Sequence, residues 1–251
     1  MAGSIAFGAL PATAGDSHTV QYVALGDSYA AGQGGGEHFD EICKQTAAAY
    51  PEQLDARKHV HLRANVGCSG ATTLKVINTQ VSALDADWTT LVTLTVGAND
   101  LGVASVAAAC TAVPPTNCQA AVANALSQLT PLAGSLANLY PAVATAAPRA
   151  LILVTGYPYL FDTHSPCLPS EAIMCRINDA TTLLNQTIED TVTAAQIAGV
   201  NIEYVDVTAA FAGHGIGGSL PLFINDTGLD AYHPNVAGYE AYAAELSAAL
   251  R

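Results

Sequence analysis

A serine, a histidine and an aspartate in this chain have the types and placing that ester hydrolysis requires. Ser28 follows the apolar run Tyr22–Leu25 in the sequence YVALGDSYAAG, at the carboxyl end of a predicted strand. A serine hydroxyl is a poor nucleophile at neutral pH and needs a base within hydrogen-bond reach. His233, in the sequence DAYHP, offers an imidazole that titrates near neutral pH. Asp230 is the nearest carboxylate that would orient this imidazole, so the three residues together predict nucleophilic catalysis.

Two further predicted strand ends carry residues suited to stabilising an oxyanion. Gly67 follows the predicted strand Val60–Val66, and Asn99 follows the predicted strand Leu91–Val96. We expect the backbone N–H groups of Ser28 and Gly67 and the side-chain amide of Asn99 to converge on one point. Losing one such donor typically slows catalysis by about 10²–10³-fold. Each residue taken alone also fits an ordinary turn or helix cap, so the prediction depends on their convergence.

The elements that must position these residues alternate between strands and helices along the chain. Apolar runs predict two more strands, and apolar residues at helical spacing predict the intervening helices. This alternation indicates an α/β fold in which a parallel sheet carries helices on both faces. The further strands are predicted at Ala150–Thr155 and Asn201–Val207, and the helices at Thr46–Ala56, Ala71–Leu84, Gln119–Ala146 with interruptions near Pro131 and Pro141, Ile177–Ala198, and from Asn235 onward.

Four sequence blocks, taken in order, resemble those of the GDSL or SGNH hydrolase family. They are Gly26-Asp27-Ser28, Gly67 in the sequence NVGCSG, Gly97-Ala98-Asn99-Asp100, and Asp230 with His233-Pro234. The resemblance extends from residue 22 to residue 234. It implies a flavodoxin-like three-layer α/β/α fold with a five-stranded parallel sheet. It also implies a serine esterase or lipase that needs neither a metal nor a cofactor. In some members a backbone carbonyl replaces the acidic partner of the histidine. Because Asp230 is present here, we expect a Ser28–His233–Asp230 triad that acts through an acyl-enzyme.

Six cysteines, none in a Cys-x-x-Cys motif, indicate disulfides and an oxidising compartment rather than a zinc site. Their order suggests the local pairs Cys43–Cys68, Cys110–Cys118 and Cys167–Cys175, although six cysteines allow other pairings. The arrangement resembles that of secreted lipases, esterases and phospholipases A of actinomycetes. In those proteins the segment corresponding to residues 211–215 commonly continues to a cysteine, which is missing here, so the third pair is a substitute.

Composition limits the possible partners and the location of the protein. The net charge of −13, with only eight Lys and Arg residues, argues against binding nucleic acid or anionic membranes. No apolar run is long enough to cross a bilayer, so we expect no stable membrane insertion. Residues 1–15 are interpreted as a signal-peptide remnant or a disordered arm, and residues 16–251 as a single domain. We expect a secreted monomer that acts on an ester or lipid substrate.

Two other functions are compatible with the same residues. One is a carbohydrate esterase that removes acetyl groups from a polysaccharide, and the other is a binding module without catalysis. Apolar residues near the histidine favour an acyl chain, while one Trp and 6% aromatic residues offer few platforms for sugar rings. The apolar residues are Leu220, Leu222, Phe223 and Ile224. A binding module would not need Ser28, Asn99 and His233 together.

Overall fold

The computed structural model describes residues 19–57, 59–111 and 117–250. The predicted signal-peptide remnant or arm, residues 1–15, lies outside these described residues. In chain order the strands and helices are β1 Val20–Gly26, α1 Ser28–Ala31, β2 His38–Asp40, β3 Gln45–Thr46, α2 Tyr50–Asp55, β4 Val60–Asn65, α3 Thr73–Lys75, β5 Leu91–Thr95, α4 Val103–Thr111, α5 Cys118–Ser127, α6 Leu129–Ala146, β6 Leu151–Thr155, α7 Ala172–Ile197, β7 Ile202–Val205 and α8 Val236–Ala249.

Five of these strands form a parallel sheet in the order β4-β1-β5-β6-β7. The connection from β1 leads to β4 on one side, and the connection from β4 then crosses to β5 on the other side. The order therefore reverses between β1 and β5, which is where open α/β sheets bind ligands. Leaving aside the separate hairpin β2–β3, which was not predicted, this is the flavodoxin-like strand order, and the predicted fold class is confirmed.

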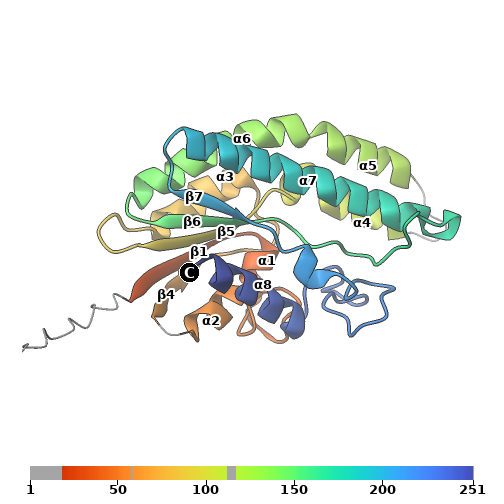
Figure 1. Ribbon diagram of the computed structural model, residues 1–251, viewed down its shortest axis with the longest axis horizontal. Coiled ribbons are helices and arrows are strands. Elements are labelled where there is room, and N and C mark those ends of the chain that lie inside the picture. The colour runs from red at the N-terminus through yellow and green to blue at the C-terminus, as the bar shows by residue number, and fades with distance from the viewer. Residues whose placement is uncertain (1–18, 58, 112–116, 251) are drawn as a thin grey trace, which may run out of the picture.

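Helices cover both faces of the sheet (Figure 1). Helices α2 and α8 lie on one face, and α3, α6 and α7 lie on the other, with α4 and α5 beyond the carboxyl ends of the strands. The strands β1 and β5 are buried on both faces, as central parallel strands usually are. Between α2 and α8 the buried rings of Tyr50 and Tyr242 stack with their centroids 5.5 Å apart. The three layers thus share one apolar core, above which the strand ends converge.

Of the two interruptions predicted in the region Gln119–Ala146, the structure has the one near Pro131 and lacks the one near Pro141. The break lies at Gln128, between α5 and α6, and α6 runs on past Pro131 and Pro141. Pro131 falls in the first turn, where a backbone N–H has no helical acceptor. Pro141 removes one interior hydrogen bond, but its neighbours Leu139, Tyr140 and Val143 are fully buried. Packing of this apolar face offsets the cost of the proline.

The predicted helix Ala71–Leu84 is shorter and has a different buried face. After α3 the chain forms a π-helical turn over Val76–Gln80 and then a 3-10 turn. A π turn contains one extra residue, so it rotates the side chains that follow it. Leu74 is exposed, although apolar, whereas Val76 and the polar Gln80 are buried. The buried Gln80 amide bonds to the main chain of Gly26, two residues before Ser28.

Other helix boundaries in the structure differ from the predicted ones by several residues. The helix predicted at Thr46–Ala56 covers only Tyr50–Asp55, because Thr46 pairs in the hairpin β2–β3 and Pro51 occupies the first helical turn. Helix α7 starts at Ala172, before the predicted Ile177. At the start of α8, Asn235 is the predicted N-cap, and its side chain accepts a hydrogen bond from the Gly238 N–H.

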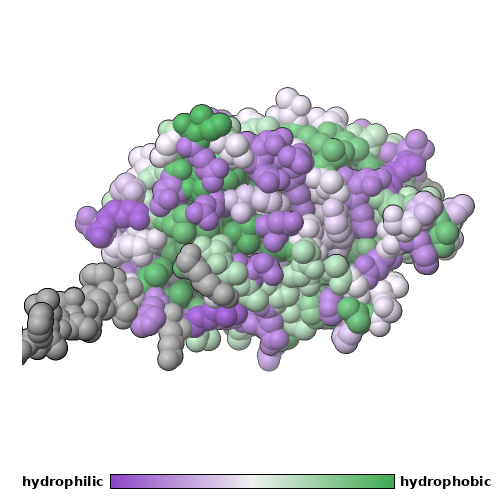
Figure 2. Space-filling model, viewed as in Figure 1, coloured by the Kyte–Doolittle hydropathy of each residue, from purple (hydrophilic) through white to green (hydrophobic). Residues whose placement is uncertain are grey.

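Among the described residues, no helix is both long enough and apolar enough to cross a membrane. The side of the molecule seen in Figure 2 carries hydrophilic side chains interspersed with apolar ones.

Candidate active site

The turn that carries Ser28 leaves the central strand β1 through a glycine that no other residue can replace without strain. Gly26 has φ 138°, and a Cβ at this position would collide with the Thr95 carbonyl oxygen of β5. Asp27 then caps the short helix α1 by accepting a hydrogen bond from the Tyr29 N–H at 2.9 Å. Ser28 is therefore the first helical residue, where a backbone N–H has no acceptor within the helix. Its hydroxyl faces a cavity beyond the strand ends.

His233 lies against this serine although 205 positions separate the two in the sequence. Its Nε2 is 2.9 Å from the Ser28 Oγ, and its Nδ1 is 3.2 Å from the Ala231 carbonyl oxygen. A carbonyl oxygen only accepts, so Nδ1 carries the proton and Nε2 accepts the hydrogen bond from the serine hydroxyl. Burial lowers the pKa of His233, which keeps the imidazole neutral at neutral pH. The pair has the geometry and protonation state of a nucleophile and its base.

The side chain of Asp230 does not lie against His233, although the sequence analysis expected it to. Its Oδ1 accepts a hydrogen bond from the Gln33 Nε2 at 3.1 Å and lies 3.7 Å from the His38 Nε2. Only the main chain of Asp230 contacts the histidine, since its carbonyl oxygen accepts from the His233 N–H at 3.1 Å. The intervening Tyr232 has φ 70°. This tight turn brings the Ala231 carbonyl under the imidazole and directs the Asp230 carboxylate toward Gln33.

Asn99 lies at the cavity, as its position after β5 suggested. It begins a 3-10 turn that follows Gly97, and it lines the cavity together with Ser28. One hydrogen of its side-chain amide is donated to the Ala71 carbonyl oxygen at 3.0 Å. The amide nitrogen carries two hydrogens, so a second donor is left for a ligand.

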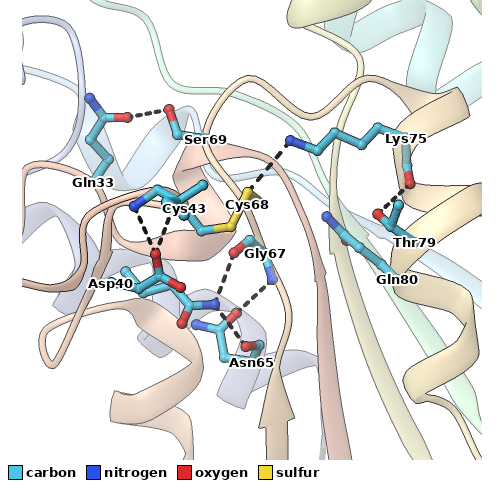
Figure 3. The surroundings of a disulfide bond; sticks show 12 residues. Gln33, Asp40, Cys43, Asn65, Gly67, Cys68, Ser69, Lys75, Thr79 and Gln80 are labelled. Carbon is cyan, nitrogen blue, oxygen red and sulfur yellow. Dashed lines mark hydrogen bonds between the residues drawn. A yellow bond between two sulfur atoms is a disulfide. The ribbon is translucent and has the colours of Figure 1, made fainter.

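Gly67 is engaged elsewhere. Its N–H donates to the Asn65 Oδ1 at 3.0 Å, as Figure 3 shows, and Gly67 is not among the residues that line the cavity. A Cβ at Gly67 would lie 2.7 Å from the backbone nitrogen of Ala31. Close packing against α1 therefore explains the glycine at this position. Its N–H is not presented beside Ser28.

Gly70, three residues later, has the properties that the sequence analysis attributed to Gly67. It lines the cavity with Ser28 and Asn99, and its φ of 73° favours glycine. Within the part of the chain that the structure describes, no acceptor lies within hydrogen-bond distance of its N–H. The sequence NVGCSG offers both glycines, and only the path of the chain after β4 distinguishes them.

The cavity beside Ser28 has a volume of about 380 Å³ and is mainly apolar. Ser28 and His233 line one part of it, and residues of α4, α5 and α7 line another. Apolar side chains from these three helices and from the 3-10 turn before α4 form its inner wall: Leu101, Val103, Val106, Ala107, Val122, Ala125, Ile177, Ala180 and Leu184. This volume lies within the range of sites that bind organic ligands.

Three disulfides are present, with the pairing suggested from the order of the cysteines. The bond Cys43–Cys68 anchors the turn before β3 to the segment between Gly67 and Gly70 (Figure 3). The bond Cys110–Cys118 joins α4 to α5 on the far wall of the cavity, and Cys167–Cys175 fastens the start of α7. Glu171 lies near Cys167 and Cys175, and the three residues together resemble a metal-binding group. The two sulfur atoms are bonded to each other, however, so they are not thiolate ligands for a metal.

Asp27 is a fully buried carboxyl group directly before the serine. Burial raises its pKa to about 7, although hydrogen bonds from the Tyr157 hydroxyl and the Tyr29 N–H partly oppose the rise. The Tyr157 hydroxyl donates to the Asp27 Oδ2 at 2.6 Å. Beside it, the Tyr29 hydroxyl donates to the Tyr232 carbonyl oxygen at 2.7 Å, next to His233. Two tyrosines therefore join the serine turn to its neighbours.

Comparison with known proteins identifies close relatives. A family model described as GDSL-like Lipase/Acylhydrolase matches residues 24–241. Lipase 1 of Streptomyces coelicolor is 32% identical over 224 residues, which cover 86% of this chain and 81% of that protein. The crystal structure of an extracellular lipase from Streptomyces rimosus superimposes with a TM-score of 0.80 at 32% identity, over 92% of this chain and 99% of that one. A phospholipase A1 from Streptomyces albidoflavus NA297 gives 0.81 at 35% identity, with the same coverage.

Replacing the buried carboxyl group should change how stability depends on pH. Asp27 has a raised pKa in the folded state, so folding takes up a proton between about pH 4 and pH 7. Its contribution to the free energy of unfolding is full below about pH 4 and is lost as the pH rises to about 7. The loss has an upper limit of about 4 kcal/mol. Asp27→Asn keeps the size of the side chain and one acceptor oxygen, which can still accept from the Tyr29 N–H, and it removes the titration.

Urea unfolding of both proteins at pH 4 and pH 8 measures this effect. We expect the free energy of unfolding of Asp27→Asn, relative to that of the natural protein, to be higher at pH 8 than at pH 4. The titration of His233 is common to both proteins and cancels in the difference. A stability difference that does not change with pH would show that Asp27 is not protonated in the fold.

Proposed function

The chain belongs to the GDSL-like lipase/acylhydrolase family and is a carboxylic ester hydrolase, and we propose that Ser28 is its nucleophile and His233 its general base. The observation that carries the proposal is the 2.9 Å contact between the His233 Nε2 and the Ser28 Oγ at the mouth of an apolar cavity. In the neutral tautomer with hydrogen on Nδ1, Nε2 accepts the serine proton directly.

The reaction proceeds through an acyl-enzyme. The Ser28 Oγ attacks the ester carbonyl carbon while His233 takes the hydroxyl proton, and the carbonyl oxygen becomes an oxyanion. The imidazolium then gives this proton to the departing alcohol. A water molecule next attacks the acyl-serine, with His233 again as base, and releases the carboxylic acid and the free Ser28 hydroxyl.

We assign the oxyanion donors to the N–H groups of Ser28 and Gly70 and to the side-chain amide of Asn99. All three residues line the same cavity. Gly70 replaces Gly67 in this assignment, because the N–H of Gly67 already donates to Asn65. Donors fixed by the backbone cost little reorganisation when the charge develops, which is the main source of their effect.

The Ala231 carbonyl oxygen, rather than the Asp230 carboxylate, orients His233 in this proposal. A carbonyl fixes the tautomer and the ring as a carboxylate does, but it carries no full charge to stabilise the imidazolium. Burial lowers the pKa of His233, and the backbone carbonyls and the charge of Asp230, which does not contact Nδ1, oppose the shift only in part. Catalysis therefore uses a Ser28–His233 dyad supported by the main chain.

The inner wall of the cavity favours an acyl chain over an acetylated sugar. Helices α4, α5 and α7 present mainly aliphatic side chains there. The hydroxyls of Thr111 and Thr181, which also line the cavity, are donated to carbonyl oxygens of their own helices. Such a chamber would bury the hydrocarbon chain of a fatty acid, while a sugar ring would leave its hydroxyl groups without partners. Lipase or esterase activity is thus favoured over carbohydrate deacetylation, and both are favoured over a module without catalysis.

We extend the proposal to location and substrate class. The three disulfides fit a secreted protein, and residues 16–251 would act as a single-domain monomer outside the cell. The net charge of −13 favours neutral or zwitterionic lipids over anionic ones. A phospholipid with a zwitterionic head group therefore belongs among the candidate substrates, as do glycerides.

The first test combines Ser28→Ala with a panel of substrates. The panel holds p-nitrophenyl esters from acetate to laurate, phosphatidylcholine, and acetylated xylan. We expect hydrolysis of the longer esters by the natural protein and a loss of at least about 10³-fold in Ser28→Ala, which lacks the nucleophile. Unchanged activity in this variant would overturn the role of Ser28. Activity confined to acetyl groups would instead support the carbohydrate deacetylase.

Asp230→Ala tests the orientation of the histidine. Loss of the aspartate of a catalytic triad lowers kcat by about 10⁴-fold. Here the Ala231 carbonyl keeps its contact, so we expect kcat on a soluble ester to fall by no more than about tenfold. His233→Ala serves as the comparison and should abolish most activity. A loss of kcat near 10⁴-fold in Asp230→Ala would contradict the dyad and support a Ser28–His233–Asp230 triad.

Ala107→Leu tests whether the chamber holds the acyl chain. A larger side chain at Ala107 shortens the chamber from the α4 side, so kcat/KM for laurate should fall at least about tenfold relative to acetate. Ala108→Leu is the matched control, because Ala108 lies on the same helix but is exposed and does not line the cavity. Equal chain-length profiles in the two variants would place the acyl chain elsewhere.

A further inference from the structure

The Tyr157 hydroxyl lies where three strands of the sheet end. Tyr157 follows β6, and its hydroxyl donates to the Asp27 Oδ2, just after β1, at 2.6 Å. The same oxygen accepts from the Ala98 N–H, just after β5, at 3.2 Å. One oxygen atom therefore links the serine turn to the turn that begins with Gly97 and carries Asn99.

The direction of these hydrogen bonds follows from the partners. The N–H of Ala98 can only donate, so the hydroxyl oxygen is its acceptor. The hydroxyl proton is then free to point at the Asp27 Oδ2, which accepts it when Asp27 is a carboxylate. The chain of hydrogen bonds runs from Ala98 through Tyr157 to Asp27.

Tyr157 is itself held firmly in place. Its N–H donates to the Asn185 Oδ1 of α7, and its carbonyl oxygen accepts from the Asn185 Nδ2, both at 2.8 Å. Its ring packs edge-on against Tyr29, with the centroids 5.1 Å apart. Both aromatic rings are buried. The hydroxyl thus has a fixed position relative to the sheet and to α7.

Asp27 precedes the nucleophile, and Ala98 precedes the oxyanion donor Asn99. We propose that Tyr157 is a positioning residue of the ester hydrolase: its hydroxyl sets the separation between the turn of Ser28 and the turn of Asn99. This inference rests on the proposed function. In the reaction, the attacking oxygen and the oxyanion donors must stay aligned around one carbonyl group. An error of about 1 Å in such alignment lowers the rate by about 10²-fold.

Tyr157→Phe removes only the hydroxyl and keeps the ring against Tyr29. With a soluble p-nitrophenyl ester, and with enzyme counted by titration of reactive serine, we expect kcat to fall between about tenfold and a hundredfold. KM should stay within about twofold, because the aliphatic side chains of α4, α5 and α7 that line the cavity are unchanged. The rate of covalent reaction with a p-nitrophenyl phosphonate, which makes a tetrahedral adduct on Ser28, should fall in parallel with kcat.

Tyr140→Phe is the matched control. Tyr140 is also a fully buried tyrosine, on α6, and its hydroxyl has no hydrogen-bond partner among the described residues. Its removal should leave kcat, KM and the phosphonate rate unchanged. Equal kcat values for Tyr157→Phe and the natural protein would overturn the inference, as would equal losses in both tyrosine variants.

The partner Asp27 offers a second arm, and its first comparison does not require Tyr157→Phe to fold. Asn at this position still presents an amide group that can hydrogen-bond to the Tyr157 hydroxyl oxygen and Ala does not, so Asp27→Ala should lose several-fold more kcat than Asp27→Asn. In the Asp27→Ala background, Tyr157→Phe should change kcat by less than about twofold, because the link is already broken. Equal losses in Asn and Ala variants, or full additivity of the double variant, would contradict the inference.

These outcomes are separate from those of the proposed function. If the natural protein hydrolysed no ester, the proposed function itself would be wrong. Ester hydrolysis by the natural protein together with an unaffected Tyr157→Phe would remove only the positioning role.

Discussion

The main chain of Gly26 is the point on which the site depends. Its N–H and carbonyl groups lie in the core, and the buried side-chain amide of Gln80 bonds to both, at 2.7 and 2.8 Å. The same carbonyl accepts a hydrogen bond from the Cys68 N–H. Gly26 also lies so close to Thr95 of β5 that a side chain at this position would collide with the Thr95 carbonyl oxygen. A buried backbone group without partners would be costly, so this arrangement lets β1 end inside the molecule. The turn of Ser28 starts from that end.

Much of this architecture could be predicted from the sequence. Apolar runs located the five strands of the sheet, and the order of the blocks predicted that Ser28, Asn99 and His233 would meet at one edge. Such predictions succeed because the spacing of apolar residues within a short segment indicates whether it forms a strand or a helix. They also succeed because parallel strands bring their carboxyl ends to the same edge of the sheet. The π-helical turn before Gln80 was not foreseen, since its extra residue gives no periodic signal. That turn places the amide that satisfies Gly26.

Two site assignments depended on information that the sequence does not carry locally. The direction of the Asp230 carboxylate follows from the left-handed conformation of Tyr232 and from Gln33, which is 197 positions away. The choice between Gly67 and Gly70 follows from the path of the chain after β4 and from the engagement of Asn65. Motif spacing indicates which residues gather at a site. It does not show which atoms of those residues face the reacting group.

The proposed nucleophile directly follows the first strand of the sheet, and the proposed base lies in the loop before the last helix. A ribosome makes the chain from its N-terminus, so Ser28 exists long before His233, 205 positions later, has been synthesised. The contact between the two forms only when nearly the whole chain is present. The pair therefore reports on the complete fold: a chain that ends before the 225–235 segment retains Ser28 without the imidazole that contacts it.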